Sequence, residues 1–248
     1  MGNRIPCQTF SGDMFANSPF PKPIFLEQLK NFPIPVAFFF LRDIIHSVSA
    51  KGSDETMKLH YKGKYDLNSE SLPHGEHMPG AVKFKEAEDT KKMAWIGNLI
   101  GIGLLILFGV PAFLRCKTYI LDNIGMIWLG SILSMLTLFP HELLHAICFR
   151  EDVYLYTNLA QGMLFVIGPE TMTRRHFVFM SLLPNLVFGF LPYLVGMFLP
   201  QYPILLCFGL MSITCGAGDY YNVFNAMTQM PKGARTYLYQ FHSYWYLP

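Results

Sequence analysis

Hydrophobic residues gather in four long runs along the second part of the chain, separated by short polar links. The runs cover approximately residues 94–114, 125–148, 177–199 and 204–227. Each approaches the ~20 residues that a helix needs to cross ~30 Å of hydrocarbon. Because lipid offers no partners to backbone N–H and C=O groups, we expect every run to be helical. The pattern predicts a mainly α fold, a polytopic membrane helix bundle of about four spans within residues 94–230.

The segments on either side of these runs have a different character. Residues 57–93 are polar and rich in lysine and glutamate, which predicts a cytoplasmic lead-in to the first span. Residues 1–56 carry scattered prolines and one apolar run that is too short to cross a bilayer, so we expect a poorly ordered or interfacial extension. One hypothesis is that Met57 is the natural start. Residues 231–248 form an aromatic C-terminal tail that suits the membrane interface.

Composition supports a membrane protein. The chain is 52% hydrophobic and 15% charged, which is too apolar for an ordinary soluble domain. Its formal net charge of +2 shows no nucleic-acid footprint, so membrane lipid is the expected environment and nucleic acid is not an expected partner. The five cysteines have no C-x-x-C spacing and are interpreted as small apolar side chains.

Lysine and arginine positions predict the orientation of the spans. Basic residues lie before the first run, between the second and third, and after the fourth: Lys83, Lys85, Lys91, Lys92, Arg150, Arg174, Arg175, Lys232 and Arg235. The opposite side has only Arg115 and Lys117. Because basic residues favour the cytoplasmic side, we expect a multi-pass protein of the cell membrane with both termini in the cytoplasm.

A β-hairpin is expected directly after the second run. Residues 153–157 and 163–167 are β-prone, with Asn158 and Gly162 between them, and they lie on the predicted cytoplasmic side. An exposed hairpin edge can hold a substrate peptide by strand addition. A purely structural flap is the other interpretation, and the sequence leaves both open.

The second run contains His141-Glu142-Leu143-Leu144-His145. Residues four apart share one face of a helix, so His141 and His145 can offer nitrogens to one metal ion. Glu142 lies beside them, placed to take a proton from a water that the metal activates. Ionisable groups within lipid are costly and usually functional. The alternative is a helix with two hydrogen-bonded core histidines.

Zinc held by such a motif normally needs a third protein ligand, and Asp219 is the acidic residue within the last two runs. His141 and Asp219 lie about 13 and about 12 Å from the cytoplasmic ends of their spans, so their depths match. Asn185, at a similar depth, and Asn222, one turn beyond Asp219, are candidates to support the ligands or contact substrate. The residues from Gly216 to Gly218 are expected to let the fourth helix approach the second closely. Alternatively, Asp219 and Asn185 only link packed helices.

These segments carry a family resemblance. The sequences at 141–146, 182–185 and 218–219 resemble the zincin peptidase family of small bacterial membrane proteins, which is similar in plan to site-2 proteases. The resemblance covers roughly residues 57–240. It implies a zinc-dependent peptidase with His141, His145 and Asp219 as ligands and Glu142 as catalytic base. Site-2 proteases place their aspartate in an Asn-Pro-Leu-Asp-Gly style motif, whereas here Asn185 and Asp219 lie in separate runs.

The sequence therefore predicts a zinc metallopeptidase that hydrolyses peptide bonds at or in the membrane by water activation. Its expected substrate is a peptide or a membrane protein. Two other classes stay open: a membrane protein that binds or transports metal, and a non-catalytic scaffold. A transporter usually shows polar residues along a whole path, whereas here they gather at one depth.

Overall fold

The structure is a computed structural model that describes residues 58–248 except 159 and 161. These residues belong to one unit, Gly52–Pro248. The expectations for residues 1–56, including an interfacial segment and a start at Met57, lie outside the described residues.

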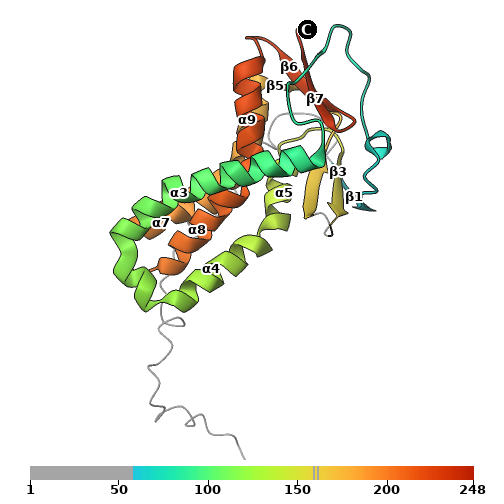
Figure 1. Cartoon of the computed structure of the whole chain (residues 1–248). Helices are drawn as coiled ribbons and strands as arrows, with labels where there is room; N and C mark the ends of the chain where they lie inside the picture. Colours follow the sequence, from blue (N-terminus) through green and yellow to red (C-terminus); the bar gives the residue numbers. More distant parts are fainter. Residues whose placement is uncertain (1–57, 159, 161) are drawn as a thin grey trace, which may run out of the picture. The chain divides into compact units, whose positions relative to one another are not determined.

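Helices make up most of the described chain, which confirms the mainly α prediction (Figure 1). They are α3 (Thr90–Asp122), α4 (Ile124–Leu136), α5 (Leu138–Ala146), α6 (Arg174–Pro184), a π-helical turn η3 (Asn185–Phe190), α7 (Leu191–Phe198), α8 (Pro203–Cys215) and α9 (Ala217–Gln229). A short 3-10 turn, η1 (Ser69–Ser71), precedes them.

Three helical segments of the described chain are long and apolar enough to cross a membrane. They are Lys91–Asp122, Ile124–Ala146 and Arg174–Phe198. The fourth predicted run is broken: α8 and α9 meet at a bend of 51°, and they make a fourth span only when counted together. The first helix also continues beyond the predicted run ending near residue 114, through Pro111 and as far as Asp122.

The helix α8 is the centre of the helical part, in contact with α3, α4 and α7 (Figure 1). Its Gly209 is essential for the fit against α7, since an added Cβ would lie 2.3 Å from the backbone nitrogen of Tyr193. Leu206 and Ile213 of α8 are buried in the same core. Small residues thus allow close helix packing at this contact.

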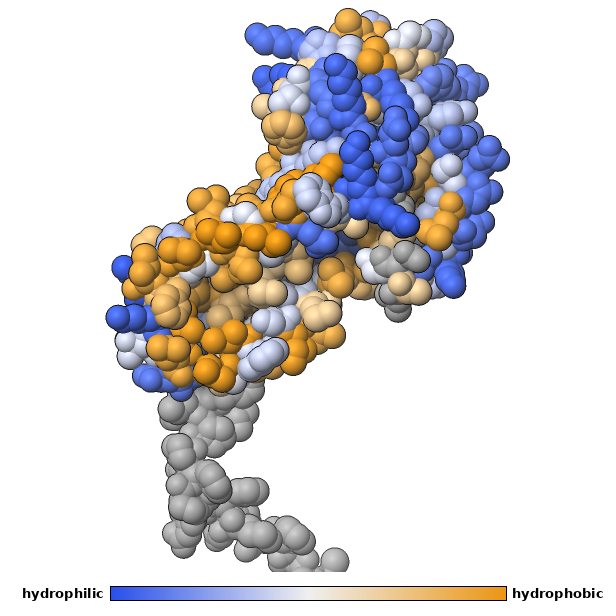
Figure 2. All heavy atoms as spheres, viewed as in Figure 1, coloured by the Kyte–Doolittle hydropathy of each residue, from blue (hydrophilic) through white to orange (hydrophobic). Residues whose placement is uncertain are grey.

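The outward faces of α3 and α4 are apolar. Trp95 and Leu114 of α3 are 66% and 71% exposed, and Trp128 of α4 is 71% exposed. Figure 2 shows this hydrophobic surface over the helices, whereas the end formed by the strands is largely hydrophilic. Large exposed apolar surfaces of this kind suit lipid contact and are unusual for monomeric soluble proteins.

One sheet contains the expected hairpin. Strands β3 (Val153–Asn158) and β4 (Met163–Ile167) pair antiparallel, as the sequence predicted. Strand β1 (Leu59–Lys64) from the lead-in pairs parallel with β3. This strand was not predicted, because residues 57–93 are polar and were expected to be a connection to the first span. The order β1-β3-β4 leaves the outer edge of β4 without a strand partner in the described part of the chain.

A second sheet combines the lead-in and the C-terminal tail. Its order is β2 (Val82–Lys83), β7 (His242–Tyr246), β6 (Arg235–Tyr239) and β5 (Met172–Thr173). The tail is therefore a hairpin in a sheet, whereas its sequence predicted only an aromatic interfacial segment. Glu86 joins the lead-in to this hairpin by accepting the Ser243 N–H at 2.8 Å, and burial raises the pKa of its carboxyl.

The same lead-in holds α9. The Lys85 N–H donates to Gln229 Oε1 at 2.7 Å, and the Ala87 N–H donates to Tyr221 Oη at 3.1 Å. Both acceptors lie on α9, the helix that carries Asp219. The polar segment before the first span thus helps to fix the position of one candidate ligand.

Candidate metal centre

The helix α5 presents both motif histidines to one side. It follows α4 after a break at Thr137, and the His141 N–H donates to the Thr137 carbonyl at 2.8 Å. Pro140 lies in the first turn of α5, where a missing N–H breaks no regular helical bond. The imidazole rings of His141 and His145 are one turn apart, with centroids 4.9 Å from each other.

Asp219 comes from the first turn of α9, immediately after the bend at Gly216. Its N–H donates to the Gly216 carbonyl at 3.0 Å, which starts the new helix. A carboxylate is favoured at a helix N-terminus because the unpaired N–H groups carry positive partial charge. The break in the fourth apolar run therefore sets the position and the electrostatic environment of this carboxylate.

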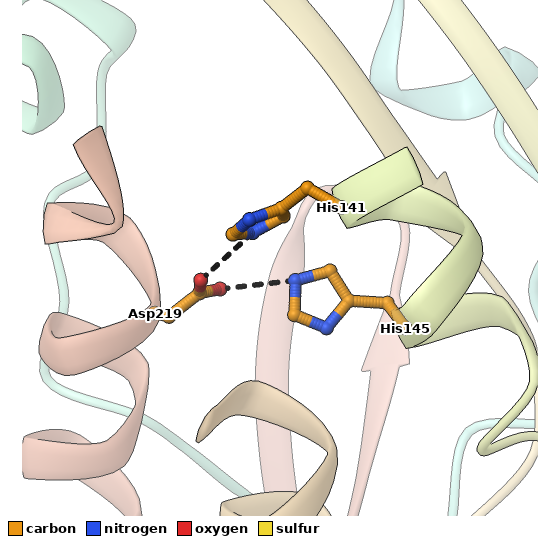
Figure 3. A group of neighbouring side chains, drawn as sticks. All are labelled: His141, His145 and Asp219. Carbon is orange, nitrogen blue, oxygen red and sulfur yellow. Dashed lines mark hydrogen bonds and ion pairs between the residues drawn. The ribbon is translucent and has the colours of Figure 1, made fainter. Parts of the chain in front are cut away.

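The three side chains converge from α5 and α9 (Figure 3). His141 Nε2 lies 3.0 Å from Asp219 Oδ2, and His145 Nε2 lies 3.2 Å from Asp219 Oδ1. One ligand atom from each residue lies within 4.8 Å of the others. Atoms bound tetrahedrally at 2.0–2.1 Å are separated by about 3.3–3.4 Å, and the two histidine–carboxylate distances lie close to that spacing.

Hydrogen bonding at His145 tests whether a cation fits. Its Nδ1 lies 3.0 Å from the Met180 carbonyl, which can only accept, so Nδ1 carries a hydrogen and donates it. The other nitrogen, Nε2, faces an Asp219 oxygen. Two acceptors at that distance need a proton or a cation between them. Two imidazoles and one carboxylate also match the ligand chemistry of catalytic zinc sites, so the residues fit this metal.

Asn185 supports Asp219 from a third segment. It is 1% exposed, lies at the start of the π-helical turn η3, and donates from Nδ2 to Asp219 Oδ2 at 2.6 Å. Such hydrogen bonds to a metal-binding carboxylate fix its orientation. Asn222, the other asparagine candidate, is exposed on α9, and among the described residues no hydrogen bond joins it to the three side chains.

Glu142 contacts the β-hairpin. Its Oε2 accepts the Val166 N–H of strand β4 at 3.0 Å. This N–H points away from β3, so the free edge of β4 lies along α5. This contact was not predicted from the sequence. The short link between residues 146 and 153 was the available signal, because it keeps the hairpin beside the helix that precedes it.

The two glycines at the bend between α8 and α9 do not have the role that the sequence suggested. An added Cβ at Gly216 would lie 1.7 Å from Asn185 Oδ1, whereas one at Gly218 has no heavy atom within 4 Å. Gly216 therefore leaves space for the side chain of Asn185 in η3. The absence of a side chain at Gly218 is not needed for any close contact with the described residues. The idea that both let the fourth helix approach the second was wrong.

Gly216→Ala is expected to displace Asn185 and to break its bond to Asp219. We expect a loss of about 10–100-fold in zinc affinity, as for other partners of metal ligands, and about 1–3 kcal/mol in stability from overpacking. Gly218→Ala is the matched control and should leave zinc affinity unchanged. Chelator competition and thermal unfolding in detergent measure both quantities. Equal zinc affinity in the two variants would contradict the role of Asn185.

The fold and the site define a class: a mainly helical protein with apolar helices of membrane-spanning length and a cluster able to hold a metal ion. Residues 134–235 match the model of the family described as "Putative zincin peptidase". That range includes the histidine motif, Asn185 and Asp219, so the resemblance to the zincin peptidase family is confirmed over residues 134–235. The likeness to site-2 proteases stays a prediction. No curated protein and no solved structure matches the chain.

Proposed function

We propose that this chain is a membrane-embedded zinc peptidase that hydrolyses peptide bonds at or in the membrane. The carrying observation is the convergence of His141, His145 and Asp219 beside Glu142, within the residues that match the zincin family. The apolar outer faces of the helices support a membrane location. By the distribution of basic residues, both termini are cytoplasmic and the protein is a multi-pass protein of the cell membrane.

The three ligands of the proposed zinc ion are His141 Nε2, His145 Nε2 and one oxygen of Asp219. When bound, zinc supplies a Lewis acid that polarises a peptide carbonyl and increases the acidity of water. The imidazoles approach from α5 and the carboxylate from α9, so the site depends on the packing of two helices that are far apart in sequence.

Glu142 is the proposed general base. One of its oxygens accepts the Val166 N–H, which orients the carboxylate and leaves the other oxygen to take a proton from the attacking water. The same group then delivers that proton to the leaving amine.

We propose that substrate binds at the free edge of strand β4. The proposed substrate is a peptide or a segment of a membrane protein. Residues two apart on a strand point their N–H and C=O groups to the same edge, so Leu164 shares the edge of Val166. An extended peptide can pair with the N–H and C=O of Leu164 there and lie along α5, while the Val166 N–H stays bonded to Glu142.

Metal removal tests the proposal. Full-length protein in detergent should cleave some members of a mixture of internally quenched fluorescent peptides. A zinc chelator should lower that hydrolysis to background, and added Zn²⁺ should restore it. Hydrolysis that persists after the metal has been removed would refute a zinc peptidase. Stoichiometric zinc without any hydrolysis would instead favour a metal-binding or transporting protein, and absence of bound metal would favour a scaffold.

A further inference from the structure

The Met180 carbonyl is free to accept a hydrogen bond from His145 because a proline follows it four residues later. In an α-helix the carbonyl of residue i accepts the N–H of residue i+4. Four residues after Met180 is Pro184, which lies inside α6 and has no N–H. The Met180 carbonyl has therefore lost its regular helical donor, and it accepts the His145 Nδ1–H at 3.0 Å.

We propose that Pro184 is a positioning residue of the metal centre, which acts through the Met180 carbonyl on His145. The bond to this carbonyl keeps the hydrogen on Nδ1 and turns Nε2 toward Asp219, the arrangement a metal ligand needs. The role of zinc in this proposal rests on the proposed function. The replacement of the missing Pro184 N–H by the His145 Nδ1–H as donor to the Met180 carbonyl does not depend on it.

The next residue continues the same rearrangement. The backbone N–H of Asn185 donates to the Leu182 carbonyl instead of the Ser181 carbonyl. The Ser181 carbonyl is then approached by Asn185 Nδ2 at 3.4 Å, and that amide also bonds Asp219. The π-helical turn begins here, a feature that is frequent at functional sites. The Pro184–Asn185 pair thus connects α6 to two of the three proposed ligands.

Burial makes this arrangement specific. Pro184, Ser181 and Asn185 are each less than 2% exposed, and Met180 and His145 are partly buried, so little water reaches these groups. A regained N–H at position 184 would give the Met180 carbonyl its helical donor back. A carbonyl can accept two hydrogen bonds, but the new bond would draw it toward the helix axis and weaken its bond to His145.

Two substitutions restore that N–H while they differ in size. Pro184→Val keeps most of the buried volume, and Pro184→Ala leaves a smaller side chain. Both are expected to weaken zinc binding by about 10–100-fold in chelator competition, the usual loss for a partner of a metal-ligating histidine. The Tm of metal-free Pro184→Val should not fall, because proline is unfavourable inside a helix. Pro111→Ala, at an exposed proline inside α3, is the matched control and should keep wild-type zinc affinity.

A spectroscopic measurement separates this proposal from the proposed function. In protein labelled with ¹⁵N-histidine, the Nδ1–H resonance of His145 is assigned by its absence from His145→Gln. We expect it in wild type with and without Zn²⁺, and we expect both Pro184 variants to lose it. Retention of the resonance in the Pro184 variants would overturn the role of Pro184. If wild type binds zinc, equal zinc affinity in the variants and wild type would overturn it as well. A wild type that binds no zinc would refute the proposed function, and the resonance would still decide about Pro184.

Discussion

Glu142→Gln should lower peptide hydrolysis by about 10²–10⁴-fold, the usual contribution of a general base, and leave zinc bound. The glutamine carbonyl can still accept the Val166 N–H, so the local structure is expected to remain. The amide cannot take a proton from water, so the chemical step loses its base. Hydrolysis of the fluorescent peptides and zinc content per chain measure the two effects on the same sample.

Glu170→Gln is the matched control for this experiment. The Glu170 carboxylate also accepts a backbone N–H, that of Arg150 at 2.6 Å, but it lies outside the cluster. The Glu170→Gln variant should retain both peptide hydrolysis and bound zinc. Full hydrolysis in Glu142→Gln would exclude the base role, and loss of zinc from that variant would mean that the carboxylate helps to hold the metal.

Local spacing explains which part of the site could be predicted. His141 and His145 are four residues apart, so the helix alone brings their rings together. Asp219 is 78 residues from His141 and was found by its depth in a parallel span, a weaker argument that needs the correct helix directions. The structure brings all three within reach of one ion, although it bends the fourth run just before Asp219.

The missed features depend on contacts between distant segments. The parallel pairing of β1 with β3 joins residues 59 and 153, and the sequence of neither strand indicates which strand it pairs with. The Val166 contact with Glu142 requires the hairpin to fold back on α5. Asn185 was predicted to be near the site, but the need for glycine at position 216 became visible only from the position of its side chain. Hydropathy identifies the helices, whereas backbone irregularities at Pro184 and Gly216 determine how the polar side chains meet.

Asp219→Asn should remove most of the bound zinc. The substitution keeps the size of the side chain but removes the negative charge that balances a divalent cation between two neutral imidazoles. We expect zinc affinity to fall by more than about 100-fold, beyond the loss caused by an outer partner of a ligand. His141→Ala should lose zinc as well. Metal analysis of purified protein should give one zinc per chain in wild type and far less in both variants.

The exposed Asp122→Asn at the end of α3 is the matched control, because it makes the same chemical change away from the cluster. It should keep one zinc per chain. The helix-packing alternative predicts a different result, since Asp219 would then only bond the histidines. In that case Asp219→Asn would lower the thermal stability of the protein and leave its metal content equal to that of wild type. A normal zinc content in Asp219→Asn would therefore refute the role of this carboxylate as the third ligand, whatever happens to the Tm.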